Sequence, residues 1–301
     1  MIALPTTAAK EKSAVKKLLA LVLGLILMLS AVPCLAQTAD DPALAEGADV
    51  RIMSFNLMNP DWSKVPVTDR TQKVVDTLLY YQPDVVGIQE ANAKWQKALK
   101  PVLTETGLYN PACRQSNAAG FKYNMSAFMY NVATVQLVEE AVLDLDPGSD
   151  IRVLAVAVFE KLSDGTRFVV ANTHPASSTE TENYNRNCED IMTLGKEQME
   201  KYAGLPFIFT GDYNTNETSE MYTTLMENLG VKDAKYEADV LVRDHVTYIA
   251  WGEEFDAANP YYIDHIFVNA NTDVKLFNVV VDFDMRSVTD HFPIYADIDL
   301  Q

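Results

Sequence analysis

The sequence predicts a single α/β domain, because segments with helical spacing and segments with strand alternation are mixed along the whole chain. No Gly- or Pro-rich linker divides it into two self-contained halves. Its 301 residues, 48% of them hydrophobic and 22% charged, suit a globular fold and exclude a disordered tail or a collagen-like fibre.

The first 36 residues are predicted to be a secretory signal. Four lysines precede an apolar run at residues 18–29, and small residues then lead to Ala36. This order predicts export, with cleavage after Ala36 and release to the periplasm, the cell surface or the medium. The run is short for a membrane span of about 20 residues, and an uncleaved N-terminal anchor is the alternative. Residues 37–48 are expected to be an exposed lead-in to a domain at residues 49–301.

The charge balance is strongly acidic, with 42 acidic and 24 basic residues and a formal net charge of −18. Removal of the signal leaves 20 basic and 41 acidic residues, a net charge of −21 that keeps an exported protein soluble. This balance argues against a broadly basic nucleic-acid clamp. It does not exclude a nuclease, because a bound divalent cation can supply the missing positive charge.

Periodicity places the first elements of the domain. Apolar and polar residues alternate at residues 51–57, which predicts a strand. Apolar residues on one helical face predict a helix at residues 68–81, which Pro83 ends. The apolar run at residues 84–88 predicts a buried strand, and a helix is expected at residues 92–106.

The rest of the chain is expected to contain strands and two more helices. The predicted strands are residues 125–131, 151–161, 167–173, 205–210, 246–251, 262–268, 274–283 and 292–300. The predicted helices are residues 182–202 and 219–229. The turn Ser163-Asp164-Gly165 joins two of these strands as a hairpin.

Polar residues recur where these strands end. They are Asn56, Gln89-Glu90, Asn172-Thr173-His174, Gly211-Asp212-Tyr213-Asn214, Asp264-His265 and Thr289-Asp290-His291. An acid beside a buried strand is costly unless it is paired or metal-bound, so this recurrence predicts one shared polar pocket at the rim of a sheet. Taken singly, each motif has a structural alternative: Glu90 could cap a helix, and His174 could be an ordinary core histidine.

With these motifs in this order, the sequence from about Arg51 to Gln301 resembles the endonuclease/exonuclease/phosphatase superfamily. The resemblance implies a DNase-I-like, four-layer α/β/β/α sandwich: two mixed, mainly antiparallel sheets packed face to face, with outer helices. It also implies an active site at one rim, where an activated water attacks a phosphodiester or phosphomonoester in line.

The resemblance further implies a divalent cation held by Glu90, with Asn56 supporting the metal or a phosphate oxygen and Asp290 as a second carboxylate. Mg²⁺ or Mn²⁺ is expected because such hard cations take carboxylate oxygens and keep waters, and Ca²⁺ is left open. Met58 stands where abasic-site endonucleases carry an aspartate. This departure, together with export, argues against an abasic-site repair enzyme.

By the same resemblance, Asp212 would orient or deprotonate the attacking water, and Asn214 would donate an N–H to the phosphoryl oxygen. His291 would contact the phosphate as an acid or electrostatic stabiliser, with Asp264 orienting its imidazole. His174 would stabilise the phosphate from the other side. These roles differ between family members.

Two further residues are candidates for substrate binding. Asn124 falls where some relatives place a polar partner for His174, and Arg186 is one of several cations that could touch a phosphate. His245 is expected at the surface. Cys113 and Cys188 remain after signal removal, and they could form a disulfide in an exported protein or be two buried thiols.

The substrate class stays open among nucleic acid, a phospholipid head group and a small phosphorylated molecule. A monomer without an obligate protein partner is expected. The alternative is a catalytically silent binding module on the same fold, which would lack the equivalents of Glu90, Asp212 or His291. All three are present, which favours the enzyme.

Overall fold

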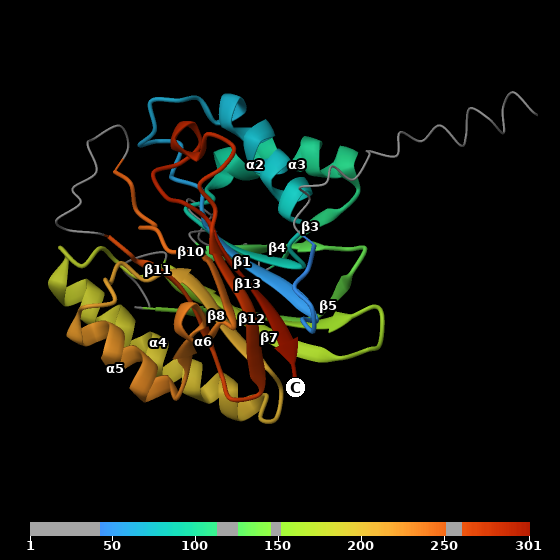
Figure 1. Cartoon of the computed structure of the whole chain (residues 1–301). Helices are drawn as coiled ribbons and strands as arrows, with labels where there is room; N and C mark the ends of the chain where they lie inside the picture. Colours follow the sequence, from blue (N-terminus) through green and yellow to red (C-terminus); the bar gives the residue numbers. More distant parts are fainter. Residues whose placement is uncertain (1–42, 113–125, 146–151, 251–260) are drawn as a thin grey trace, which may run out of the picture. The chain divides into compact units, whose positions relative to one another are not determined.

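Two β-sheets lie face to face, and helices cover their outer sides (Figure 1). The computed structural model describes residues 43–112, 126–145, 152–250 and 261–301. Within these residues, one sheet has seven strands: β1 (Val50–Asn56), β2 (Val85–Gln89), β3 (Tyr109–Ala112), β4 (Ser126–Asn131), β10 (Val240–Arg243), β12 (Thr272–Val279) and β13 (Ile294–Leu300). The other has six: β5 (Val135–Asp144), β6 (Val153–Lys161), β7 (Arg167–Thr173), β8 (Phe207–Asp212), β9 (Lys232–Asp233) and β11 (Asp264–Val268).

The strand order is β10-β12-β13-β1-β2-β4-β3 in the first sheet and β5-β6-β7-β8-β11-β9 in the second. The pairs β1/β2, β7/β8 and β10/β12 are parallel, and the other described pairs are antiparallel. Both sheets are therefore mixed and mainly antiparallel, as the family resemblance implies.

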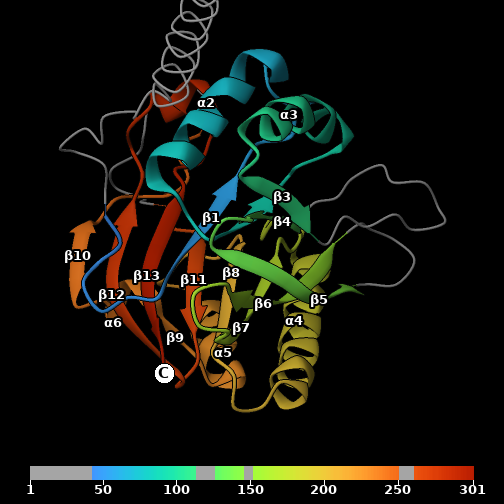
Figure 2. The ribbon, with the colours of Figure 1, turned by 90° about the vertical axis from the view of Figure 1, so that its right-hand side faces the viewer.

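The long helices lie on the outer faces of the sheets (Figure 2). α2 (Val67–Tyr81) and α3 (Ala93–Thr106) lie on the seven-stranded sheet, and α4 (Thr181–Lys201) and α5 (Glu220–Leu229) lie on the six-stranded sheet. The short elements are α6 (Ala234–Glu237) and the 3₁₀ helix η1 (Met285–Ser287). One apolar cluster fills the space between the sheets and beneath α2 and α3, and a second lies beneath α4 and α5. The predicted four-layer sandwich is confirmed.

Most predicted elements occur within two residues of their expected bounds. The strand expected at residues 246–251 is wrong for its described part, where Tyr248 forms only an isolated bridge with His291. The strand expected at residues 274–283 starts earlier and ends at Val279. β3, β5 and β10 were not predicted. β5 and β10 expose much of their surface, so their sequences lack the clean alternation of half-buried strands.

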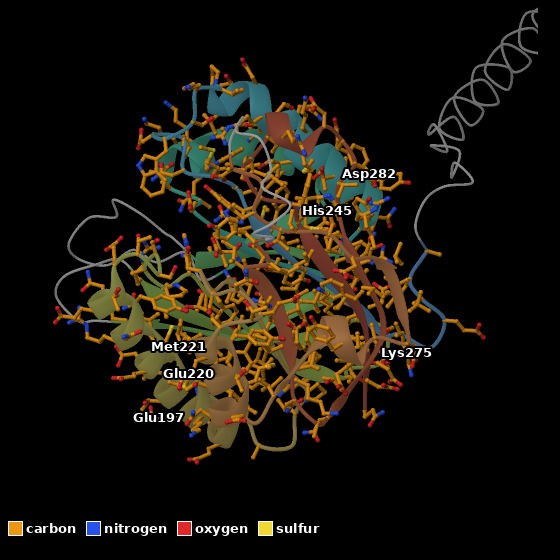
Figure 3. All side chains as sticks on the ribbon, turned by 60° about the vertical axis from the view of Figure 1, so that its left-hand side comes forward. Glu197, Glu220, Met221, His245, Lys275 and Asp282 are labelled. Atoms are coloured by element: carbon orange, nitrogen blue, oxygen red, sulfur yellow. The ribbon has the colours of Figure 1, made fainter. Side chains whose placement is uncertain are left out.

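Glu197 on α4 and Glu220 on α5 are exposed acidic side chains of the helices that cover the six-stranded sheet (Figure 3). Beneath α4, Cys188 is a buried free thiol, and burial raises its pKa to about 12. Cys113, its candidate partner, lies outside the described residues, as does the proposed signal. In the part of the chain that is described, no helix has the length and apolar character needed to cross a membrane.

Candidate active site

The strand registers bring the predicted site residues to one rim of the sandwich. In the parallel pair β1/β2, Asn56 lies opposite Gln89, so Glu90 follows beside it. In the antiparallel pair β8/β11, Asp212 and Asp264 lie opposite each other. Since β13 runs antiparallel to β1, the segment that precedes β13 and carries Asp290 and His291 returns to the end of β1.

Asn56 joins the two sheets at this rim. Its Nδ2 donates to Glu90 Oε1 at 3.3 Å and to Asp212 Oδ2 at 3.0 Å. The backbone N–H of Asn59 donates to the other Glu90 oxygen at 2.5 Å. Glu90 itself has a φ of 60°, a left-handed conformation that costs a non-glycine residue about 1–3 kcal/mol and that persists where the surroundings enforce it. The Glu90 carboxylate is therefore held in a fixed position.

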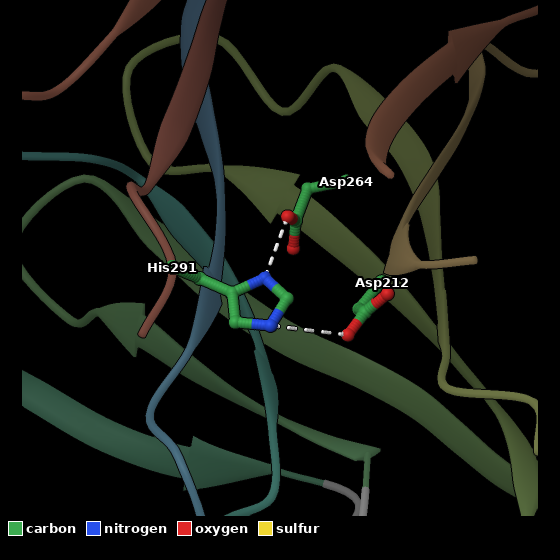
Figure 4. Close-up of side chains that lie close together, drawn as sticks. All are labelled: Asp212, Asp264 and His291. Atoms are coloured by element: carbon green, nitrogen blue, oxygen red, sulfur yellow. Dashed lines mark hydrogen bonds and ion pairs between the residues drawn. The ribbon is translucent and has the colours of Figure 1, made fainter. Parts of the chain in front are cut away.

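His291 lies between two carboxylates (Figure 4). Its Nδ1 donates to Asp264 Oδ2 at 2.8 Å, and its Nε2 lies 3.6 Å from Asp212 Oδ2. Asp290 Oδ1 is 4.0 Å from the same Nε2. Because the side chains of His291, Asp264 and Asp212 are almost fully buried, these charges interact with little screening by water.

A second imidazole faces Asp212 from the other side. His174 Nε2 lies 3.4 Å from Asp212 Oδ2. His174 Nδ1 is buried and has no hydrogen-bond partner among the described residues. Asn124, its expected partner, lies outside the described residues. In the loop after β8, the backbone N–H of Asn214 donates to Asp212 Oδ1 at 2.9 Å. The Asn214 side chain donates to the Pro175 carbonyl.

The environment of the rim shifts the pKa values of its titratable groups in opposite directions. Burial raises the pKa of Asp212 to about 7, although His291 acts against this. Burial and then Asp290 raise the pKa of Glu90. Burial alone would lower the pKa of His291, but Asp264 and Asp212 raise it well above its ordinary value. Burial, Arg152 and His291 lower the pKa of His174 well below its ordinary value. Such separation of neighbouring pKa values is typical of acid–base sites.

The donors at the rim fit a hard divalent cation. Glu90 and Asp290 supply carboxylate oxygens, which such cations prefer. Asn56 turns its Nδ2 toward Glu90, and its Oδ1 accepts from the Met58 N–H. Asp212, Asp264 and His291 also bring ligand atoms within 4.8 Å of one another. However, the His291 Nδ1–H is already committed to Asp264, so this second group resembles an oriented imidazole more than a set of metal ligands. The acids outnumber the cationic groups facing them, and an added cation would offset their repulsion.

Some predicted residues lie away from the rim contacts. Arg186 is on α4, where its guanidinium donates to Asn183 of the same helix. His245 is half-buried, against the expectation of a solvated ring, and packs edge-to-face on Phe292 with ring centroids 5.1 Å apart. His265, next to Asp264, points to the opposite face of β11 and contacts Asp233.

Two contributors to the rim were missed by the sequence reasoning. Thr247 Oγ1 accepts from the backbone N–H of Asp264, which fixes the start of β11, and no local pattern distinguishes it from other loop threonines. Arg70 is fully buried beneath the loop that follows β1. A charged residue in a helix normally faces solvent, so its sequence position gave no signal.

Known proteins share this architecture. A sequence model described as the Endonuclease/Exonuclease/phosphatase family matches residues 53–291. An endonuclease/exonuclease/phosphatase structure from Bacteroides vulgatus is 24% identical, with a TM-score of 0.70 over 84% of this chain and 99% of that chain. A mannosyl-6-phosphatase from Bacteroides thetaiotaomicron is 20% identical, with a TM-score of 0.68 over 83% and 99%. The human Nocturnin catalytic domain with bound sulfate is 19% identical, with a TM-score of 0.65 over 84% and 94%.

No curated protein sequence matches the chain. At these identities the structural matches show the fold, whereas the family match spans most of the sequence. Members of that family are phosphoesterases or nucleases. The chain belongs to the endonuclease/exonuclease/phosphatase family.

Proposed function

We propose that this protein is a secreted, metal-dependent phosphoesterase that hydrolyses a phosphate ester by in-line attack of water. The main support is the convergence of Asn56, Glu90, Asp212 and His291 on one rim through direct contacts. Phosphoester hydrolysis needs charge neutralisation, an oriented water and a stabilised leaving oxygen. The acids, amides and imidazoles of this rim can meet all three needs.

Glu90 and Asp290 would hold the cation, and Asn56 would support it by orienting the Glu90 carboxylate. When bound, the cation supplies the positive charge that neutralises the phosphate. Glu90 suits this role because two of its bonds, from Asn56 and the Asn59 backbone, fix its oxygens before any ligand arrives.

Asp212 would orient the water and take its proton. Its Oδ1 is fixed by the Asn214 backbone, while its Oδ2 faces both imidazoles. Neutral His174 can donate to a phosphoryl oxygen or receive a proton, and the Asn214 amide is a further donor toward the phosphate. His291 remains protonated because Asp264 holds its Nδ1, so its Nε2–H can stabilise the phosphate or protonate the leaving oxygen. Asn124 and Arg186 stay as predicted substrate contacts.

The decisive experiment is hydrolysis of bis-p-nitrophenyl phosphate by the purified protein with Mg²⁺ or Mn²⁺, with chelator as the negative control. Asp212→Asn and His291→Ala should each lower kcat by at least about 10²-fold, because each removes a proton-transfer or charge-stabilising group. Full activity of either folded variant would refute the assignment of that residue.

The substrate is best sought with a panel, each member tested with and without metal. Structural relatives include a mannosyl-6-phosphatase and a zebrafish TDP2 in complex with a single-stranded DNA product. The panel therefore contains hexose 6-phosphates, single-stranded and plasmid DNA, RNA, sphingomyelin and inositol phosphates. The acidic charge of the chain favours small phosphate esters over long duplex DNA. Secretion is tested by N-terminal sequencing of the exported protein, which should begin at Gln37.

A further inference from the structure

A buried arginine binds two loops at the rim: the loop after β1, which contacts Glu90, and the loop before β13, which carries Asp290. Arg70, in the first turns of α2, has no exposed surface. Its Nη1 donates to the carbonyls of Leu57 at 3.1 Å and Val288 at 2.8 Å, and its Nη2 donates to the carbonyl of Met58 at 3.3 Å. One planar guanidinium thus joins the loop after β1 to the loop before β13.

Each of these loops is connected to a carboxylate of the proposed metal site. Met58 lies between Asn56, whose Oδ1 accepts from the Met58 N–H, and Asn59, whose N–H donates to Glu90. Val288 is two residues before Asp290. A shift of either loop would therefore move the Glu90 or Asp290 carboxylate.

The surroundings of Arg70 fix its orientation. The guanidinium lies over the ring of Trp95, 4.6 Å from its centroid, and the Trp95 indole N–H donates to the same Met58 carbonyl at 3.0 Å. Met58 has a φ of 53°, a conformation that needs support in a residue with a side chain. Asp290 and Glu90 also interact with the Arg70 charge, which partly offsets the fall of its pKa to about 10 on burial.

We propose that Arg70 is a positioning residue for the metal site: its guanidinium holds the loop after β1 and the loop before β13 in register. The inference rests on the proposed function. Arg70 does not touch the substrate, and it acts through the backbone of residues 57–59 and 288–290. Loss of a residue that orients metal ligands typically costs about 10- to 100-fold in metal affinity.

The test is Mn²⁺ binding to the purified full-length protein, measured by electron paramagnetic resonance on wild type, Arg70→Met and Arg70→Lys. Arg70→Met should weaken binding at least about 10-fold. Arg70→Lys keeps an N–H donor for the loop carbonyls but loses the planar fork that joins them, so its affinity should lie between those of Arg70→Met and wild type.

Arg51→Lys is the matched control. Arg51 is also a buried arginine bonded to a backbone carbonyl, but it lies at the other end of β1 and pairs with Asp297. The Arg51→Lys variant should be less stable than wild type and should bind Mn²⁺ with the wild-type affinity.

The outcomes separate the two proposals. If wild type binds no divalent cation, the proposed function fails. If wild type binds Mn²⁺ and a folded Arg70→Met binds it equally well, only the positioning role fails. An equal loss of Mn²⁺ affinity in Arg51→Lys would also overturn the positioning role. Unfolding of both Arg70 variants under conditions in which Arg51→Lys stays folded would overturn it as well. Either result would mean that Arg70 contributes to general stability and not to the metal site in particular.

Discussion

One carboxylate oxygen, Asp212 Oδ2, faces two imidazoles in opposite protonation states. His174 is 3.4 Å away and kept neutral by burial, whereas His291 is 3.6 Å away and kept charged by Asp264 and Asp212. The Asp212 carboxylate, which is the proposed base, therefore lies between a neutral ring and a charged ring, and the charged ring of His291 is the proposed acid. The difference comes from Asp264, which contacts only one of the two rings in the described structure.

This arrangement predicts the pH dependence of hydrolysis. The base Asp212 must be ionised, so kcat/KM should rise as the pH increases through about 7, or somewhat lower when a bound cation favours the ionised form. The acid His291 has a pKa well above 6.5, so activity should fall only in the alkaline range. The measurement is kcat/KM at constant metal from pH 5 to 10. His245→Gln should reproduce the wild-type profile, and a rate that does not change between pH 5 and 7 would contradict the role of Asp212.

At the level of elements, the pattern of apolar residues was sufficient for the buried strand β7 and for the amphipathic helix α2. The bounds of β7 were predicted residue for residue, and α2 was predicted to within one residue. The segment at 246–251 failed because its apolar residues pack around the rim as a loop, and hydrophobicity alone does not supply a strand partner.

The same limit applies to the candidate site. Asp212 and Asp264 follow from strand ends, since register places such residues together. Arg70 and Thr247 could not be predicted, because their partners are backbone carbonyls or amides far away in the sequence. A local pattern contains no information about such distant backbone contacts.

The close approach of the two sheets predicts the effect of Gly87→Ala in β2. An added Cβ would collide with Thr210 Oγ1 and lie 2.7 Å from Asn172 Oδ1. Both side chains are buried and hydrogen-bonded to each other, so they cannot move without loss. Gly87→Ala should lower the free energy of unfolding by about 1–3 kcal/mol, measured by urea denaturation.

The matched control for Gly87→Ala is Gly195→Ala on α4, whose Cβ would meet the movable end of the Leu229 side chain at 2.7 Å and the Phe209 ring at 3.3 Å. This variant should change stability by less than about 1 kcal/mol, since alanine favours the helix. Equal stabilities of the two variants would show that the sheets tolerate wider spacing at Gly87.

For the whole molecule, acidic charge and a buried acidic rim both oppose the folded state at neutral pH. Glu90 has a raised pKa in the fold, so its favourable contribution to stability is present below its ordinary value of 4.5 and is lost as the pH rises through the folded value. A cation bound at the rim would reverse this effect, because it favours the ionised carboxylate and binds only the folded chain.

Stability and metal binding should therefore be linked at pH 8. Mg²⁺ or Mn²⁺ at 100 times its dissociation constant should stabilise wild type by about 2.7 kcal/mol, and chelator should remove the increment. Glu90→Gln removes a buried negative charge, so it should raise the thermal midpoint in chelator and abolish most of the metal-dependent increment.

Glu197→Gln, on the exposed surface of α4, should change neither quantity. Differential scanning calorimetry of the three proteins with and without metal measures both effects. If Glu90→Gln retained the full increment, the cation would bind elsewhere, and the Asp212, Asp264 and His291 group would become the metal site to test.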